Sequence, residues 1–165
     1  MCVLIVIAME KNNKFNLFHF IFIFSFFFFF SKSIAYSEEY FLSLKNNEVN
    51  LRLGPSFEYP VKLTYEKKYL PVLILDKFEA WRQIKDHQNN SGWIHVSQLS
   101  KKKTAINIKN NSIIYKNSTI YSKPLAKLEI GRLVLIKKCQ SKWCKISSGK
   151  YKGWIIKNYL WGKIQ

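Results

Sequence analysis

The chain has 165 residues and a formal net charge of +17, with 27 Lys and Arg against 10 Asp and Glu. Such a charge favours a polyanionic partner. So few acidic residues show no carboxylate pair for acid–base catalysis, and the length is enough only for small domains.

Residues 1–35 have the pattern of a secretory signal peptide. Residues 15–30 are almost all Phe, Ile or Leu, lysines precede them, and the small residues of Ser-Ile-Ala follow and end at Ala35. A basic start, a short apolar run and small residues spaced as A-x-A are typical of such a peptide. The run is shorter than the roughly 20 apolar residues of a transmembrane helix, but an uncleaved membrane anchor is the rival interpretation. Met9 is an alternative start of the chain.

Cleavage after Ala35 would leave about 130 residues, the size of one ordinary domain or two very small ones, with a net charge of about +15. We therefore expect an exported, periplasmic protein with no integral membrane span and no nucleic-acid partner. Lysines occur throughout the chain. This distribution favours solvated faces and weak, non-specific attachment to anionic envelope surfaces over a specific polyanion site.

The rest of the chain shows a pattern of short strands. Its apolar runs are rich in Val, Ile, Tyr and Trp, and turn residues such as Gly54-Pro55 and Asn89–Gly92 separate them. Many short strands at regular spacing predict small β-barrels or sandwiches. The main runs are 49–53, 70–75, 81–84, 93–96 and 105–108.

One phrase occurs twice, as GWIHVSQL at residues 92–99 and as GWIIKNYL at residues 153–160. Another tryptophan precedes each phrase at nearly the same distance. Such self-similarity indicates duplication of one structural unit. We therefore predict two domains, residues 45–109 and residues 112–165, with a strand at 104–108 that closes the first barrel.

The first unit resembles the bacterial SH3-like domain family. The resemblance rests on residues 49–55, 59–61, 70–72, 81–84 and 92–95, which read VNLRLGP, YPV, LPV, WRQI and GWIH. It implies an all-β fold of two tandem small SH3-like β-barrels after the signal peptide. It also implies a non-enzymatic binding or scaffolding protein of the cell envelope that recognises peptidoglycan, through its peptide part, or a protein partner.

The second unit departs from this pattern. It has only Ile120–Pro124 where the first unit has Asn-Leu-Arg and Gly-Pro, and the stretch from Pro124 to Trp143 is shorter than that from Pro55 to Trp81. In similar folds this loop helps to form the ligand groove. We therefore expect a shortened second domain and place the binding surface on the first.

Four residues are candidates for ligand binding, because in similar folds they lie on or beside loops that border the groove: Arg52, Tyr59, Trp81 and His87. Aromatic rings can stack on peptide or sugar, and Arg can clamp a carboxylate with two hydrogen bonds. Each residue also has a purely structural interpretation. Trp81 would cap the barrel, Arg52 would pair with an acidic residue, and His87 would be a solvated turn residue.

Cys139 and Cys144 flank residues 140–143, which lie between two strand-like runs and read as a hairpin loop. Cysteines on facing strands of an exported protein predict a disulfide. A metal site is not expected, since no third Cys remains after cleavage and His87 and His95 belong to the other half of the chain. The C-x₄-C spacing also differs from the C-x-x-C of a redox pair.

We expect no enzyme activity and no cofactor. A Cys nucleophile would need a free thiolate and an activating His, whereas both remaining cysteines are assigned to a disulfide. Two other classes of function stay open. The protein could be a membrane-anchored structural protein if residues 15–30 are retained, or an accessory regulator of a cell-wall enzyme.

Overall fold

The computed structural model describes residues 39–164, so the signal peptide predicted for residues 1–35 lies outside the described residues. The described part consists mostly of strands, with two short 3₁₀ helices, η1 (Val96–Gln98) and η2 (Lys157–Tyr159). In residues 39–164 there is no helix with the length and apolarity to cross a membrane.

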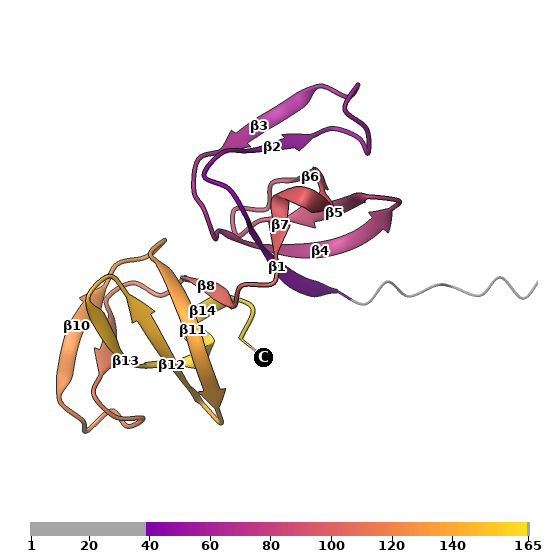
Figure 1. The fold of residues 1–165 in the computed structure, drawn as a ribbon. Coiled ribbons are helices and arrows are strands. Elements are labelled where there is room, and N and C mark those ends of the chain that lie inside the picture. The colour runs from indigo at the N-terminus through magenta and orange to yellow at the C-terminus, as the bar shows by residue number, and fades with distance from the viewer. Residues whose placement is uncertain (1–38, 165) are drawn as a thin grey trace, which may run out of the picture. The chain divides into compact units, whose positions relative to one another are not determined.

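The first repeat is a seven-stranded antiparallel sheet in the order β3-β2-β6-β5-β4-β1-β7 (Figure 1). Its strand bounds are β1 (Tyr40–Leu44), β2 (Val49–Arg52), β3 (Val61–Tyr65), β4 (Pro71–Phe78), β5 (Trp81–Lys85), β6 (Ser91–His95) and β7 (Leu99–Ser100).

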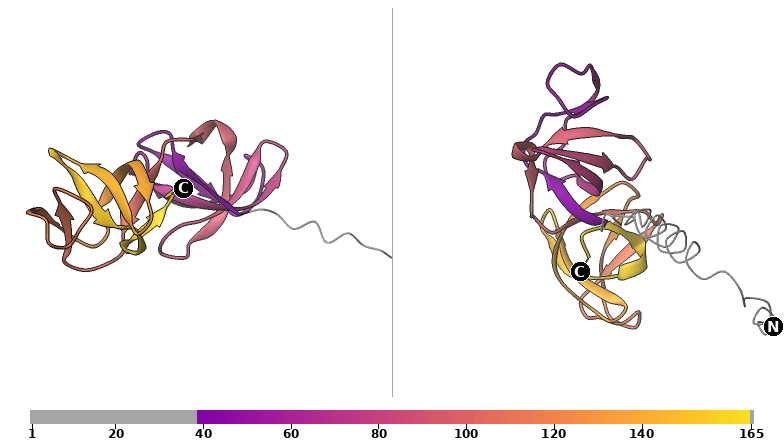
Figure 2. Two further views of the ribbon diagram at one scale, coloured as in Figure 1. Left: turned by 90° about the horizontal axis from the view of Figure 1, so that it is seen from below. Right: turned by 90° about the vertical axis from the view of Figure 1, so that its right-hand side faces the viewer.

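The second repeat has the same topology, strand for strand, in the order β10-β9-β13-β12-β11-β8-β14. Each sheet curls on itself instead of lying flat (Figure 2). The predicted all-β fold of two tandem small barrels is therefore confirmed. The strand bounds are β8 (Thr104–Asn107), β9 (Ser112–Tyr115), β10 (Pro124–Leu128), β11 (Leu133–Gln140), β12 (Trp143–Ser148), β13 (Tyr151–Ile156) and β14 (Leu160–Gly162).

The expectation that residues 104–108 close the first barrel is wrong. Strand β8 pairs with β11 and β14 and so belongs to the second sheet. Its Ile106 side chain nevertheless packs in the core of the first repeat, with Leu44 and Leu99. Strand β8 thus contributes side chains to both cores, with Ile106 in the first and Ala105 in the second, while its backbone belongs to the second sheet. Sequence position alone does not separate these two roles.

The doubled Gly-Trp-Ile phrase marks a close strand crossing in each repeat. A Cβ at Gly92 would lie 2.6 Å from the Arg52 carbonyl oxygen, and one at Gly153 would lie 2.5 Å from the Tyr115 carbonyl oxygen. Glycine therefore lets β6 approach β2, and β13 approach β9. The following Ile94 and Ile155 are fully buried and belong to the two cores.

The predicted disulfide between Cys139 and Cys144 is present. The two residues are register partners on β11 and β12, with their Cα atoms 4.0 Å apart. Cys144 is fully buried and packs in the core of the second repeat. The bond therefore joins a hairpin end to the core.

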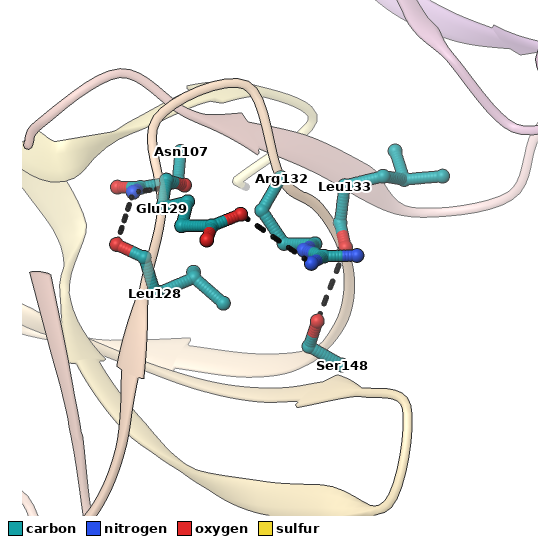
Figure 3. Close-up of polar contacts among 6 residues, drawn as sticks. All are labelled: Asn107, Leu128, Glu129, Arg132, Leu133 and Ser148. Atoms are coloured by element: carbon teal, nitrogen blue, oxygen red, sulfur yellow. Dashed lines mark hydrogen bonds and ion pairs between the residues drawn. The ribbon is translucent and has the colours of Figure 1, made fainter.

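Each repeat holds its turns with one buried polar side chain. In the first repeat, Asp86 accepts hydrogen bonds from the Tyr65 hydroxyl at 3.1 Å and from the backbone N–H groups of Gln88 and Asn90. In the second, the Asn107 amide donates to the carbonyl oxygens of Leu128 at 3.2 Å and Glu129 at 2.8 Å (Figure 3). Both contacts satisfy buried polar groups that would otherwise destabilise the fold.

Candidate functional site

A cavity of about 350 Å³ opens on the first repeat, at the ends of β2, β5 and β6. It contains aromatic, charged and amide side chains in a small space, which is typical of ligand sites. Its lining residues are Asn46, Glu48, Val49, Asn50, Arg52, Phe57, Trp81, His95 and Gln98. We call this cavity the first-repeat groove.

Three rings form the aromatic part of the groove. Trp81 and His95 are register partners on β5 and β6, and their ring centroids are 5.3 Å apart. Phe57, from the loop between β2 and β3, lies 4.9 Å from the Trp81 centroid and 5.4 Å from that of His95. Trp81 is only 7% exposed whereas Phe57 is 64% exposed. Trp81 is therefore the floor of the groove, and Phe57 is an accessible ring at its rim.

Arg52 holds the loop that carries Phe57. Its Nη1 atom donates to the carbonyl oxygens of Phe57 at 3.0 Å and Tyr59 at 2.7 Å. Its guanidinium carbon lies 5.7 Å from the Phe57 ring centroid, which is cation–π range. Within residues 39–164, Nη2 and Nε donate no hydrogen bond. Arg52 thus fixes the rim and keeps donors for a ligand.

The polar wall of the groove contains an acidic residue, whose charge is opposite to that of Arg52. Glu48 precedes β2 and lines the same cavity as Arg52. Among residues 39–164, the one ion pair links Arg132 to Glu129 in the second repeat. Glu48 and Arg52 therefore form no ion pair with each other. The groove therefore presents a carboxylate and a guanidinium beside an aromatic floor.

Two amides and an imidazole complete the wall. Asn46 Nδ2 donates to Gln98 Oε1 at 2.6 Å, which ties the loop after β1 to η1. The Ser97 backbone N–H donates to His95 Nδ1 at 3.3 Å. Ser97 Oγ lies 2.8 Å from the same Nδ1 atom.

The structure places the four candidate residues in three locations. Arg52 and Trp81 line the groove. Tyr59 does not line it, because its ring packs on Gly54, where a Cβ would lie 2.6 Å from the ring atoms. Its carbonyl oxygen contributes by accepting from Arg52. His87 lies away from the groove, with its ring centroid 6.1 Å from that of Trp161.

His87 also differs from the solvated turn residue of the structural interpretation. Its Nδ1 atom is buried and has no hydrogen-bond partner among residues 39–164. Arg52, in turn, hydrogen-bonds to backbone carbonyls where the structural interpretation expected an acidic partner.

Sequence reasoning missed Phe57, Glu48 and His95. One signal for His95 was present in the doubled phrase, where the first copy has His and the second has Ile156. Strand register shows why this position matters, since His95 pairs with Trp81 and Ile156 pairs with Trp143.

The second repeat has different chemistry at the equivalent positions. Tyr115 takes the place of Arg52, because each pairs with the tryptophan of the Gly-Trp phrase. Its ring lies 5.7 Å from that of Trp143. With Ile156 in place of His95 and Asn111 in place of Glu48, this face lacks the charged pair of the first-repeat groove.

The expectation that the second repeat has a shortened loop at this site is wrong, although its β10–β11 and β12–β13 connections are shorter than the equivalent ones in the first repeat. Pro124 pairs with Tyr115, as Val61 pairs with Arg52, so Pro124 corresponds to Val61 and not to Pro55. The loops at residues 53–60 and 116–123 are consequently of equal length. The two repeats differ at this site in side chains, not in loop length.

Comparison with known proteins gives a family for both repeats. The family described as "Bacterial SH3 domain" matches residues 45–101 and residues 109–162. No curated protein matches the chain.

Three solved structures have similar chains. They are NlpC2 of Trichomonas vaginalis, with 15% identity and a TM-score of 0.35, and NlpC1 of the same organism, with 16% and 0.35. The third is an NlpC/P60 family protein of Bacillus cereus ATCC 10987, with 12% and 0.32. The matches cover 78%, 79% and 73% of this chain and 50%, 48% and 55% of those chains. The chain thus spans about half the length of these proteins.

Proposed function

This chain belongs to the bacterial SH3 domain family, and on that premise we propose that it is a non-enzymatic binding protein of the cell envelope whose first repeat holds a short peptide. The observation that carries the proposal is the first-repeat groove, where Glu48 and Arg52 flank the aromatic floor of Trp81. A volume of about 350 Å³ suits a few residues of a peptide.

Each part of the groove matches one feature of a short peptide. The unused donors of Arg52 suit a carboxylate, for which guanidinium is the best-shaped partner. Glu48 suits an amino group. Phe57 offers an exposed apolar face on which a side chain or a sugar packs, and the buried ring of Trp81 supports it from below.

The proposed ligand is the peptide part of peptidoglycan. The family resemblance implies a wall ligand, and wall peptides present both amino and carboxylate groups. An extended peptide of a protein partner would use the same contacts. The disulfide supports a non-enzymatic role, since Cys139 and Cys144 are bonded to each other and neither is a free nucleophile.

The proposed location is the periplasm or another exported site. It rests on the sequence of residues 1–35 and is supported by the disulfide, which is typical of oxidising compartments. Mass spectrometry of the protein from cells should find an N-terminus at or near Tyr36. A membrane fraction that holds the chain with residues 15–30 intact would instead support the anchor.

Titration with purified, soluble wall peptides, followed by calorimetry, tests the peptide proposal. The key variant is Phe57→Ala, because this ring is exposed and its loss leaves the core intact. Ile120→Ala is the matched control, since Ile120 has the equivalent place in the loop of the second repeat. We expect Phe57→Ala to weaken binding at least tenfold and Ile120→Ala to leave it unchanged.

Salt separates groove binding from attraction by net charge. Contacts between exposed charges are screened beyond a Debye length of about 8 Å at physiological ionic strength. Binding through the aromatic floor should therefore survive a rise to high salt. If the affinity vanishes with salt and is the same for both variants, the groove is not the binding site.

A further inference from the structure

Most of the net positive charge of this protein lies in its second repeat, because that repeat has almost no acidic residues. Residues 104–164 contain twelve lysines and Arg132, with Glu129 as their single acidic residue. Residues 39–103 are far more balanced, with eleven Lys and Arg against seven Asp and Glu. The two repeats share a fold but differ in net charge. This observation is independent of the first-repeat groove.

Part of this charge lies in a row across one sheet face of the second repeat. Lys138 on β11 and Lys145 on β12 are direct register partners, and Trp154 on β13 is the next residue in the row. Both lysines are exposed, and Lys138 Nζ lies 5.5 Å from the Trp154 ring centroid. Like charges directly opposite each other destabilise a sheet. An anionic surface that covers this face would remove the repulsion.

A loop with an apolar tip belongs to the same repeat. Ile120 is 55% exposed and Tyr121 is 92% exposed, and Lys116 and Lys123 flank them in the loop between β9 and β10. The apolar parts of both side chains are thus exposed to water, which is energetically unfavourable. Basic residues around an exposed aromatic and an aliphatic side chain form the combination that binds a lipid–water interface, where lysines contact phosphates and apolar groups enter the headgroup region.

The loop is folded, so the tip is held out in solvent. The Lys116 N–H donates to the Lys123 carbonyl oxygen at 3.0 Å and closes the loop at its base. Inside it, the Asn117 N–H donates to Ser122 Oγ at 2.9 Å, and the Ser122 N–H donates to the Thr119 carbonyl oxygen at 3.2 Å. Binding would therefore not require ordering of the loop.

The tip and the lysine row belong to connected parts of the repeat. The loop starts directly after Tyr115, whose ring lies 5.7 Å from that of Trp143. Trp143 and Lys145 lie two residues apart on β12 and so point to the same face. The aromatic pair thus joins the base of the loop to the row that contains Lys145 and Lys138.

We propose that the second repeat docks on a bilayer of anionic phospholipid, with Ile120 and Tyr121 entering the headgroup region and the lysines contacting lipid phosphates. A soluble phosphate polymer would account for the lysines alone. It would leave the exposed apolar tip without a partner, whereas a bilayer satisfies both. The chain would then hold a membrane with one repeat and offer its peptide groove with the other.

Vesicle co-sedimentation with residues 37–165 tests this proposal. This segment is a compact unit of its own and contains both cores, and its use removes the apolar run at 15–30, which would bind vesicles by itself. The vesicles are phosphatidylcholine alone and phosphatidylcholine mixed with phosphatidylglycerol. Inorganic polyphosphate is the soluble phosphate probe, measured by calorimetry.

The variant Ile120→Ser/Tyr121→Ser removes the apolar tip without touching the core, and Phe57→Ser is its control at the equivalent loop of the first repeat. Lys138→Gln/Lys145→Gln tests the row. We expect the unchanged protein to bind only the vesicles that contain phosphatidylglycerol. The affinity for these vesicles should be at least tenfold lower for the tip variant and severalfold lower for the row variant. It should be unchanged for Phe57→Ser. Polyphosphate binding should be the same with and without the tip.

Three results would overturn the proposal. They are equal binding to both kinds of vesicle, a tip variant that binds vesicles as well as the unchanged protein, and binding to polyphosphate without binding to vesicles. The last result would identify a surface for soluble polyanions only.

Discussion

Arg52 donates a 2.7 Å hydrogen bond from Nη1 to the carbonyl oxygen of Tyr59, across the base of the loop that carries Phe57. The same atom donates to the Phe57 carbonyl oxygen at 3.0 Å. The last residue of β2 therefore sets where the accessible ring of the groove lies. This couples the stability of the loop to the shape of the binding site.

The variant Arg52→Lys should weaken peptide binding about tenfold and lower the free energy of unfolding by about 1 kcal/mol, because one ammonium cannot bond both carbonyl oxygens and also clamp a carboxylate. Calorimetry and urea unfolding measure the two effects. Arg82→Lys is the matched control, since Arg82 Nη1 also bonds two backbone carbonyl oxygens but lies outside the groove lining. Equal loss of peptide binding in both variants would contradict the assigned role.

Much of the fold followed from the sequence because the doubled phrase encodes a geometric constraint. Gly92 and Gly153 sit where two strands cross closely, and the neighbouring isoleucines fill the cores. Substitution of either glycine would force the strands apart. Such constraints leave visible marks in a single sequence, which is why the duplication and the strand-rich class were correct predictions.

The candidate site was less accessible to sequence reasoning, since it depends on register. Arg52 and Trp81 stood out by residue type, whereas His95 joins them only because β5 and β6 pair at that position. His87 was misplaced for the same reason: its turn connects the other ends of these two strands. The error over Pro124 arose because one proline was matched with another without knowledge of strand pairing.

Removal of the disulfide should destabilise the second repeat modestly. The variant Cys139→Ala/Cys144→Ala is expected to lower the free energy of unfolding by about 2 kcal/mol, because the bond closes only a short loop on the chain-entropy model. Circular dichroism should show a β fold that survives at room temperature. Wall-peptide binding should not change, since the groove lies in the other repeat. Loss of peptide binding in a folded variant would show that the repeats depend on each other.

Tyr65 should make the protein sensitive to alkali. Burial, followed by the charge of Asp86 and the hydrogen bond to it, raises the pKa of this phenol well above its ordinary value. Because the folded-state pKa lies above the unfolded one, the contribution to stability is complete below about pH 10. It is lost progressively as the pH rises toward the folded-state pKa.

Urea unfolding measures this contribution at several pH values between about 9 and about 11.5, on both sides of the ordinary Tyr pKa of about 10. The variant Tyr65→Phe should be less stable at pH 9, because Asp86 loses a hydrogen bond, but its stability should fall less steeply above pH 10. Tyr121→Phe is the control, since Tyr121 is almost fully exposed and its loss should leave the slope unchanged. A slope for Tyr65→Phe as steep as that of the unchanged protein would contradict the prediction.

The strand crossings give the last prediction, which concerns Gly92→Ala and Gly153→Ala. Each added methyl group would meet a backbone carbonyl oxygen, that of Arg52 in the first repeat and that of Tyr115 in the second, and a backbone atom yields less readily than a side chain. We expect each variant to lower the free energy of unfolding by about 2 kcal/mol or more. Gly149→Ala should cost less, about 1 kcal/mol, because nothing lies within 4 Å of its added Cβ and only the positive φ is unfavourable.

The two crossings should differ in their effect on binding. Gly92 lies close to the Arg52 carbonyl oxygen at the end of β2. A larger side chain at position 92 would therefore displace Arg52, which holds the groove rim. We therefore expect Gly92→Ala to weaken wall-peptide binding under conditions where the protein is still folded, and Gly153→Ala to leave it unchanged. Calorimetry at a temperature below both unfolding transitions provides the comparison. If the two variants bind the peptide equally, the groove does not depend on the crossing of β6 over β2, and the rim must be held by Arg52 alone.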